Sequence, residues 1–281
     1  MQIWLRRGPR PSAAARASDD EMLRAGLIGF PSSGKTALFQ LMTSAREGPR
    51  ASGKQDASVG VSRVPDERLD RLTALFNPRK HVPATIEFAD IAGVSGLKTG
   101  ATALLDIAAF RNADALLHVV RMFRDPAVAH PTGTIGPARD VRTMEDELIL
   151  ADLGVVERRL ERLERDLRKG PSAELKKEQE ILLRCRIALE EGRPLRAMQR
   201  IGEDAKRLRG FQFLSAKPLL LVLNLDEEDL PRADQATELA GLEHFVAGAA
   251  TRAVPICAKI ELEIAQLEPA DAGAAGRRRD S

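Results

Sequence analysis

A short stretch near the start of the chain, Gly29-Phe-Pro-Ser-Ser-Gly34-Lys35-Thr36, has residue types and spacing that suit phosphate chemistry. It matches the pattern GxxxxGK[ST], in which glycines let backbone N–H groups turn toward phosphate oxygens. A helix that follows would direct its positive end at the same oxygens, Lys35 would add a full charge, and the Thr36 hydroxyl is a ligand for Mg²⁺. We therefore expect a phosphate cradle made of Pro31, Ser32, Ser33, Gly34, Lys35, Thr36 and Ala37.

A second chemical element, Asp90-Ile-Ala-Gly93, comes at the end of a run whose pattern predicts a strand. A strand-end acid can hold Mg²⁺ through water, and a glycine N–H can approach the γ-phosphate. We therefore assign Thr36 and Asp90 to the metal, and Lys35 and Gly93 to the reacting phosphate; a capping aspartate is the alternative. The next residue is Val94, where many GTPases carry a glutamine that orients the attacking water, so unaided hydrolysis is expected to be slow.

A third element, Asn224-Leu-Asp-Glu227, follows another apolar strand, which is where an α/β nucleotide fold reads its base. A guanine reader normally has Asn-Lys-x-Asp, whose final carboxylate accepts both guanine N–H donors. Here Leu225 replaces the lysine and Glu227 is longer by one methylene, which weakens the case for guanine. We expect Asn224, Leu225 and Glu227 to surround the base, with Cys257-Ala-Lys259 as a weaker candidate for backbone contacts. The alternative is a capping acid after a strand.

The composition predicts a folded, water-soluble chain. Its 281 residues are 43% hydrophobic and 30% charged, which is enough for a core. A net charge of +2 is too balanced to indicate nucleic-acid binding, and the longest apolar run is far shorter than a membrane span. Cys185 and Cys257 lie far apart without metal-ligand spacing, and His118 lies in an apolar run, so all three are predicted to be packing residues in a reduced, cytoplasmic setting.

Short apolar runs separated by helical patterns predict the α/β class, with a mostly parallel sheet. Strands are expected at residues 23–29, 58–64, 84–93, 115–123, 218–225 and 254–258, and helices at residues 34–45 and 65–78. The strand at residues 58–64 has the alternation of an edge strand. Residues 46–57 are rich in polar and helix-breaking residues and are expected to form a mobile loop.

One segment interrupts this alternation of strands and helices, and its pattern predicts a projecting helical hairpin. A 4-3-4-3-4 spacing, typical of a coiled-coil seam, connects Ile149, Leu153, Val156, Leu160, Leu163 and Leu167. A break at residues 169–172 precedes a second helical pattern, so two antiparallel helices are expected; ordinary bundle packing is the alternative. We assign residues 126–210 to this coiled-coil insertion and residues 23–125 and 211–268 to one discontinuous P-loop domain. The ends, residues 1–22 and 269–281, are predicted to be disordered, although the first also has features of a transit peptide.

Taken together, these segments resemble the YchF type of Obg-like ATPases, a branch of the translation-factor-related P-loop GTPases. The resemblance covers roughly residues 25–268 and rests on GFPSSGKTALF, VPDERLDRL, VPATIEFADIAG, NADALLHVVRMF, DELILADL, RGFQFLSAKPLLLVLN and VPICAKIELEIAQL. It implies a P-loop domain with an inserted coiled coil, a preference for ATP over GTP through the NxxE pattern, and ribosome association. It also implies a hydrophobic residue in place of the catalytic glutamine, here Val94.

Four features depart from the family pattern, one of which is a shorter glycine-rich stretch after DIAG, VSGLKTGATA. Relatives usually carry a C-terminal TGS domain, which this sequence does not include. The P-loop asparagine that can support a potassium ion is Ser32 here, and residues 54–58 replace the usual Thr-Ile-Glu-Pro-Asn run. Nucleotide binding therefore carries over from the family, whereas potassium stimulation and efficient hydrolysis do not.

The sequence as a whole predicts a cytoplasmic protein that binds a purine nucleoside triphosphate with Mg²⁺ and hydrolyses it slowly. ATP is the favoured nucleotide, and the ribosome is the expected partner of the hairpin. Two alternatives stay open. A GTP-binding switch would need Asp226 to turn inward and read the base, and a non-catalytic scaffold would bind nucleotide without turnover. Neither membrane binding nor sequence-specific DNA binding is expected.

Overall fold

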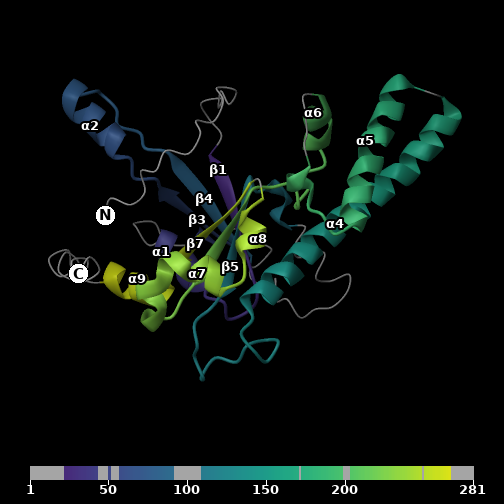
Figure 1. Ribbon diagram of the computed structural model, residues 1–281. Helices are drawn as coiled ribbons and strands as arrows, with labels where there is room; N and C mark the ends of the chain where they lie inside the picture. Colours follow the sequence, from purple (N-terminus) through teal and green to yellow (C-terminus); the bar gives the residue numbers. More distant parts are fainter. Residues whose placement is uncertain are drawn as a thin grey trace.

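The computed structural model describes residues 22–43, 50–51, 57–91, 109–170, 172–198, 203–248 and 250–266. Within these ranges, seven strands form one sheet in the order β2-β3-β4-β1-β5-β6-β7. Figure 1 shows the sheet at the centre of the molecule, with a long pair of helices extending from one side. The arrangement is the mostly parallel α/β sheet with a helical hairpin that the sequence predicts.

Five neighbouring strands of the sheet run parallel: β4 (Thr85–Ile91), β1 (Leu23–Ile28), β5 (Ala115–Arg121), β6 (Leu219–Asn224) and β7 (Thr251–Ile256). Each overlaps a predicted strand. Leu221 and Leu223 of β6 pack in the core on one face of the sheet, whereas Leu220 and Val222 pack on the other. Because both faces are buried, the sequence of such a strand is a continuous apolar run rather than an alternating one.

The antiparallel end of the sheet corrects two predictions. β3 (Ala57–Arg63) pairs with β4 on one side and with the two-residue strand β2 (Arg50–Ala51) on the other. The prediction of an edge strand at residues 58–64 holds for residues 60–63 within the described part of the chain, but not for Ser58 and Val59, because β2 pairs with them. The prediction of a mobile loop is wrong for residues 50, 51 and 57, which lie in strands, while residues 46–49 and 52–56 lie outside the described ranges. A polar strand of two residues has no apolar pattern from which it could be predicted.

Helices cover both faces of the sheet. On one face, α1 (Lys35–Thr43) contacts α9 (Ala258–Gln266), and Leu38 and Phe39 of α1 join the core. On the other face, the core includes Val141 and Met144 from the first part of α4 (Pro137–Lys169). The shorter elements are η1 (Ala109–Asn112), η2 (Leu195–Ala197), α6 (Glu203–Arg209), η3 (Glu227–Gln235), α7 (Ala236–Leu239) and α8 (Glu243–Val246).

The rest of α4 forms the hairpin with α5 (Ala173–Glu190), and the two helices are separated by the predicted break. The predicted seam is confirmed from Ile149 to Leu163, since Ile149, Val156, Leu160 and Leu163 are buried in one cluster with residues of α5. Leu153 packs against this cluster, whereas Leu167 is not part of it. Asp152, on α4, attaches the base of the hairpin to the segment that leads into β6. Its carboxylate accepts the backbone N–H groups of Leu214 at 3.0 Å and Ser215 at 2.7 Å.

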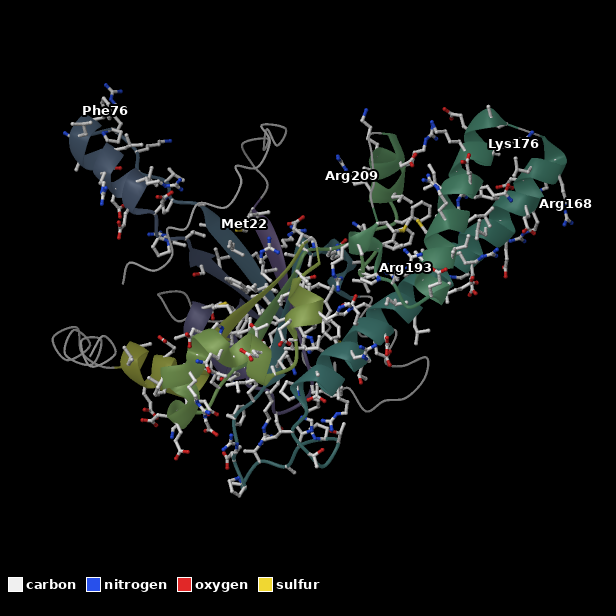
Figure 2. The ribbon with its side chains drawn as sticks, viewed as in Figure 1. Met22, Phe76, Arg168, Lys176, Arg193 and Arg209 are labelled. Carbon is white, nitrogen blue, oxygen red and sulfur yellow. The ribbon has the colours of Figure 1, made fainter. Side chains whose placement is uncertain are left out.

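The helix α2 (Glu67–Phe76) extends away from the sheet on the opposite side from the hairpin (Figure 1). Asp66 caps its start by accepting the Arg68 backbone N–H, and Asn77 ends it in the left-handed conformation. No residue of α2 is buried among the described residues, and the side chain of Phe76, labelled in Figure 2, is 71% exposed. The helix is where the sequence predicts it, but its apolar side does not belong to the core.

Candidate functional site

The loop between β1 and α1 has the bent backbone that a phosphate cradle requires. Gly29, Ser32 and Gly34 have positive φ angles of 142°, 61° and 97°. A Cβ at Gly29 would lie 2.5 Å from the Val119 carbonyl oxygen, so only glycine fits there. The helix α1 begins at Lys35, directly after the bend, and its positive end therefore faces the loop.

Lys35 folds back over this loop. Its Nζ donates to the carbonyl oxygen of Gly29 at 2.9 Å and to that of Phe30 at 2.8 Å. These bonds use two of the three ammonium hydrogens and leave the third for a phosphate oxygen. Burial lowers the pKa of Lys35, and the Asp90 carboxylate acts in the opposite direction. A positive charge that is poorly solvated interacts strongly with an anion that enters the same site.

The two predicted metal ligands lie on neighbouring elements. Thr36 is in the first turn of α1 with an exposed side chain, and Asp90 is on β4, paired in register with Leu27 of β1. Burial raises the pKa of Asp90, and the positive charge of Lys35 opposes this shift. Hydroxyl and carboxylate oxygens are the donors that Mg²⁺ prefers, so this pair fits the metal. Gly93 and Val94 lie outside the described residues.

Asn224 connects the loop to the far side of the site. Its Nδ2 donates to the Ser33 carbonyl oxygen at 3.0 Å, and its Oδ1 accepts the Ala258 backbone N–H at 3.1 Å. The contact is close, because a Cβ on Gly34 would lie 2.2 Å from Nδ2. Both ends of the buried amide are thus bonded to backbone, and Asn224 acts as a brace between the P-loop and the turn from β7 to α9.

A cavity of about 1040 Å³ adjoins this brace, and we call it the nucleotide cavity. Five predicted binding residues line it: Gly34, Ala37, Asn224, Leu225 and Glu227. Residues 257–259, the weaker candidate, line it as well. Phe123 and Leu262 add apolar surface that the sequence did not predict. The structure therefore brings the base-side candidates together around one space.

The other predicted phosphate residues do not line this cavity; they are Pro31, Ser32, Ser33, Lys35 and Thr36. They form the bent loop and the first turn of α1, next to the end of the cavity that Gly34 and Ala37 line. The Ser33 side chain is buried, whereas Ser32 is exposed. The predicted residues thus separate into the bent loop, where phosphate is predicted to bind, and the cavity, where the base is predicted to bind, joined through the bond from Asn224 to Ser33.

Asp226, which a guanine reader would need to turn inward, is bonded elsewhere. Its Oδ2 accepts the backbone N–H of Arg124 at 2.7 Å. Leu225 is buried in the wall of the cavity, and the Glu227 side chain is exposed to solvent at the start of η3. None of these three side chains adopts the arrangement of a guanine reader.

One histidine beside the loop was not predicted. The ring of His130 lies 6.4 Å from that of Phe30, measured between centroids. Its Nδ1 lies 2.9 Å from the Thr132 hydroxyl, and its Nε2 lies 3.0 Å from a carboxylate oxygen of Asp140 without the alignment of a hydrogen bond. An imidazole held in this way beside a phosphate site can orient water. No sequence pattern revealed it, because His130 lies in an irregular segment between β5 and α4.

His118 and the two cysteines are packing residues, as the sequence predicts. His118 is buried on β5, and burial, assisted by the charge of Lys35, lowers its pKa to about 3. The imidazole is therefore neutral at physiological pH. Cys185 and Cys257 are both buried, and they are not linked to each other.

Comparisons with known proteins indicate the family of this chain. A family model described as a 50S ribosome-binding GTPase matches residues 24–156. The Ribosome-binding ATPase YchF of Bacillus subtilis (strain 168) is 37% identical over 252 residues, which cover 88% of this chain and 68% of that protein. This chain belongs to the YchF family. The YchF protein of Escherichia coli O157:H7 is 34% identical over 257 residues, covering 87% of this chain and 68% of its relative.

A solved YchF structure has the same fold. The YchF GTPase of Schizosaccharomyces pombe matches with a TM-score of 0.71 at 23% identity, covering 94% of this chain and 73% of that one. In this YchF-family chain, the part matched by the GTPase model, residues 24–156, includes the P-loop, Asp90 and the first part of α4. Asn224 and the far wall of the nucleotide cavity come from outside that match.

Proposed function

We propose that this chain binds a purine nucleoside triphosphate together with Mg²⁺ and hydrolyses it slowly. The observation that carries the proposal is the Asn224 brace, which joins the bent P-loop to a cavity large enough for a nucleoside. Membership of a family whose members are named ribosome-binding ATPases supports the same conclusion.

The phosphate end is assigned from the geometry of the loop. Backbone amides of the bent loop and the third ammonium hydrogen of Lys35 hold the phosphate oxygens. The Thr36 hydroxyl and the Asp90 carboxylate hold the metal, which would neutralise charge on the outer phosphates when bound. We keep Gly93 as the donor to the reacting phosphate, on the sequence pattern alone. Slow turnover is proposed because Val94 cannot orient an attacking water.

ATP is the proposed nucleotide rather than GTP. Guanine is read by a carboxylate fixed opposite its two N–H donors, and adenine lacks both of these donors. Asp226 is bonded to the Arg124 N–H, and Glu227 is exposed, so neither carboxylate is fixed for guanine. Phe123 and Leu225 supply apolar surface on which a purine ring can pack.

We further propose that the hairpin of α4 and α5 contacts the ribosome in the cytoplasm. The names of the relatives support this partner. Arg168 and Lys176 lie at the far end of the hairpin (Figure 2), where a basic surface would attract RNA phosphates. Within the described ranges, no helix combines the length and the apolarity that a bilayer crossing would need.

Titration with fluorescent ATP and GTP analogues, with and without Mg²⁺, tests the binding proposal. We expect ATP to bind at least about tenfold more tightly than GTP, and binding to be lost in Lys35→Ala. Tight GTP binding without ATP binding would instead support the switch alternative.

Single-turnover phosphate release, measured with and without ribosomes, separates an ATPase from a scaffold. We expect slow release that depends on Lys35. Nucleotide binding without any phosphate release, or release that is unchanged in Lys35→Ala, would refute the ATPase proposal and support the non-catalytic scaffold.

A further inference from the structure

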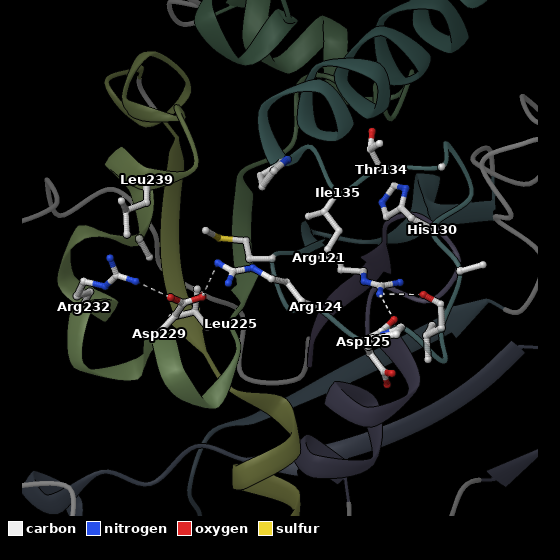
Figure 3. A pocket seen from close by; sticks show the side chains of 17 residues that line it. Arg121, Arg124, Asp125, His130, Thr134, Ile135, Leu225, Asp229, Arg232 and Leu239 are labelled. Carbon is white, nitrogen blue, oxygen red and sulfur yellow. Dashed lines mark hydrogen bonds and ion pairs between the residues drawn. The ribbon is translucent and has the colours of Figure 1, made fainter.

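A second cavity, of about 830 Å³, lies beside the nucleotide cavity, and the function proposed above assigns it no ligand. Figure 3 shows its lining, with Arg121, Ile135 and His130 on one side and Leu225, Asp229 and Leu239 on the other. We call it the Arg121 cavity. It shares four wall residues with the nucleotide cavity, namely Arg124, Asp125, Val128 and Leu225.

Arg121 is a buried cation without a carboxylate partner in the described part of the chain. Its side chain is enclosed, with 3% of the residue exposed, and no ion pair involves it among the described residues. The guanidinium donates only to backbone carbonyl oxygens: that of Phe123 from Nε at 3.2 Å, and those of Val128 and Asp125 from Nη2 at 2.9 and 3.3 Å. Nη1 has no hydrogen-bond acceptor within the described ranges.

Buried charges in proteins are normally paired, because removing an isolated charge from water is costly. Carbonyl dipoles and the face of the Phe123 ring, 4.5 Å from the guanidinium carbon, offset part of that cost for Arg121. They do not neutralise its charge. The remaining Nη1 donor is unpaired and shielded from solvent, so an anionic group that reached it from the cavity would form a charge-assisted hydrogen bond.

The other charged residues of the cavity already have polar partners. Asp229 pairs with Arg232 at 2.8 Å and with Arg124 at 3.7 Å. The Asp125 carboxylate accepts the Ala127 backbone N–H at 2.9 Å. Three arginines and two aspartates line the cavity, so its lining carries a net charge of +1. Arg124, Arg232 and Asp229 together account for this charge, and Arg121 and Asp125 carry opposite charges that no ion pair joins among the described residues.

The rest of the lining is largely apolar. Its apolar side chains include Met122, Val128, Ile135, Leu225 and Leu239. Ile135 and Leu239, which are 36% and 54% exposed, are available for apolar contact with an occupant. An occupant with an apolar body would cover them, whereas inorganic phosphate would leave them in contact with water.

We propose that the Arg121 cavity binds a small organic carboxylate, whose anionic group pairs with the Arg121 guanidinium and whose apolar body covers Ile135 and Leu239. This site is separate from the phosphate cradle and does not depend on the nucleotide assignment. Because Arg124 and Leu225 line both cavities, an occupant of the Arg121 cavity would also change nucleotide affinity. This effect on nucleotide affinity rests on the proposed function.

The test uses two probes of equal shape, 2-naphthoate and the neutral 2-naphthamide, titrated into the nucleotide-free full chain and followed by protein NMR. We expect naphthoate to bind at least about tenfold more tightly than the amide, because only the carboxylate makes a charge-assisted bond. Intermolecular NOEs should connect its ring to the methyl groups of Ile135 and Leu239. Equal binding of the two probes, or NOEs to the exposed Leu75 of α2 instead, would overturn the proposal.

A matched pair of variants locates the charge that is responsible. Arg121→Met should abolish the preference for naphthoate, whereas Arg142→Met, an exposed arginine that lines a different cavity, should preserve it. A preference that survives in folded Arg121→Met would refute the assignment. If Arg121→Met does not fold, the two probes and the NOE contacts of the wild-type chain decide the question on their own. Failure of nucleotide binding would leave this result unaffected, since no nucleotide is present.

Discussion

Replacing Asn224 by aspartate tests the brace on which the proposed function depends. The new side chain keeps an oxygen that can accept the Ala258 N–H. The Nδ2 donor, however, becomes an oxygen that faces the Ser33 carbonyl oxygen across 3.0 Å. Two acceptors then repel each other at a buried site, and the Ser33 carbonyl loses its partner. An unsatisfied buried group costs about 1–3 kcal/mol, and a buried charge adds to it, so we expect unfolding free energy to fall by about 2–4 kcal/mol.

The same change should weaken nucleotide binding, because the P-loop would move away from Asn224. A displacement that loses one to two hydrogen bonds to phosphate corresponds to about 10- to 100-fold in affinity. Urea unfolding and titration with a fluorescent ATP analogue measure the two effects separately. The matched control is Asn112→Asp, whose Oδ1 accepts from Gln212 at an exposed site and whose stability should change by about 0.5 kcal/mol or less. If Asn224→Asp is folded and binds ATP as tightly as the wild type, the brace does not position the loop.

Three further predictions concern His130, His118 and Phe76. His130→Gln should slow single-turnover phosphate release by about 10²-fold while changing ATP affinity by no more than about threefold; equal losses in both would mean that His130 only supports the loop. Because burial lowers the pKa of His118 to about 3, the unfolded chain takes up the proton first as the pH falls below the ordinary value of 6.5. Unfolding free energy should therefore decrease with falling pH, by up to about 1.4 kcal/mol per pH unit from this residue. When unfolding free energies are measured with urea between pH 7 and 5, those of His118→Leu should depend less steeply on pH than those of the wild type. Identical slopes would contradict the burial argument. Phe76→Ser should change unfolding free energy by only about 0.5 kcal/mol, because the side chain is 71% exposed, and a loss of several kcal/mol would show that α2 packs against something in solution.

Much of the fold could be predicted because it depends on residues close to each other in the sequence. The apolar run of β6 and the spacing from Ile149 to Leu167 each reflect the period of one element, and both elements were found where expected. The strand β2 could not be predicted, since only its pairing with β3 defines it. The same limit explains α2, whose sequence has an apolar side like that of a core helix but whose position leaves that side exposed.

The candidate site likewise has one part that the local sequence determined and another that only the tertiary structure determined. The motif from Gly29 to Thr36 by itself determined a phosphate cradle at the start of a helix, because glycine backbone freedom and helix polarity are local properties. Only the tertiary structure decided that Asn224 holds the loop and that Asp226 is bonded to Arg124. These contacts join segments about one hundred residues or more apart, and no local pattern can specify which of several polar groups will meet across such a distance.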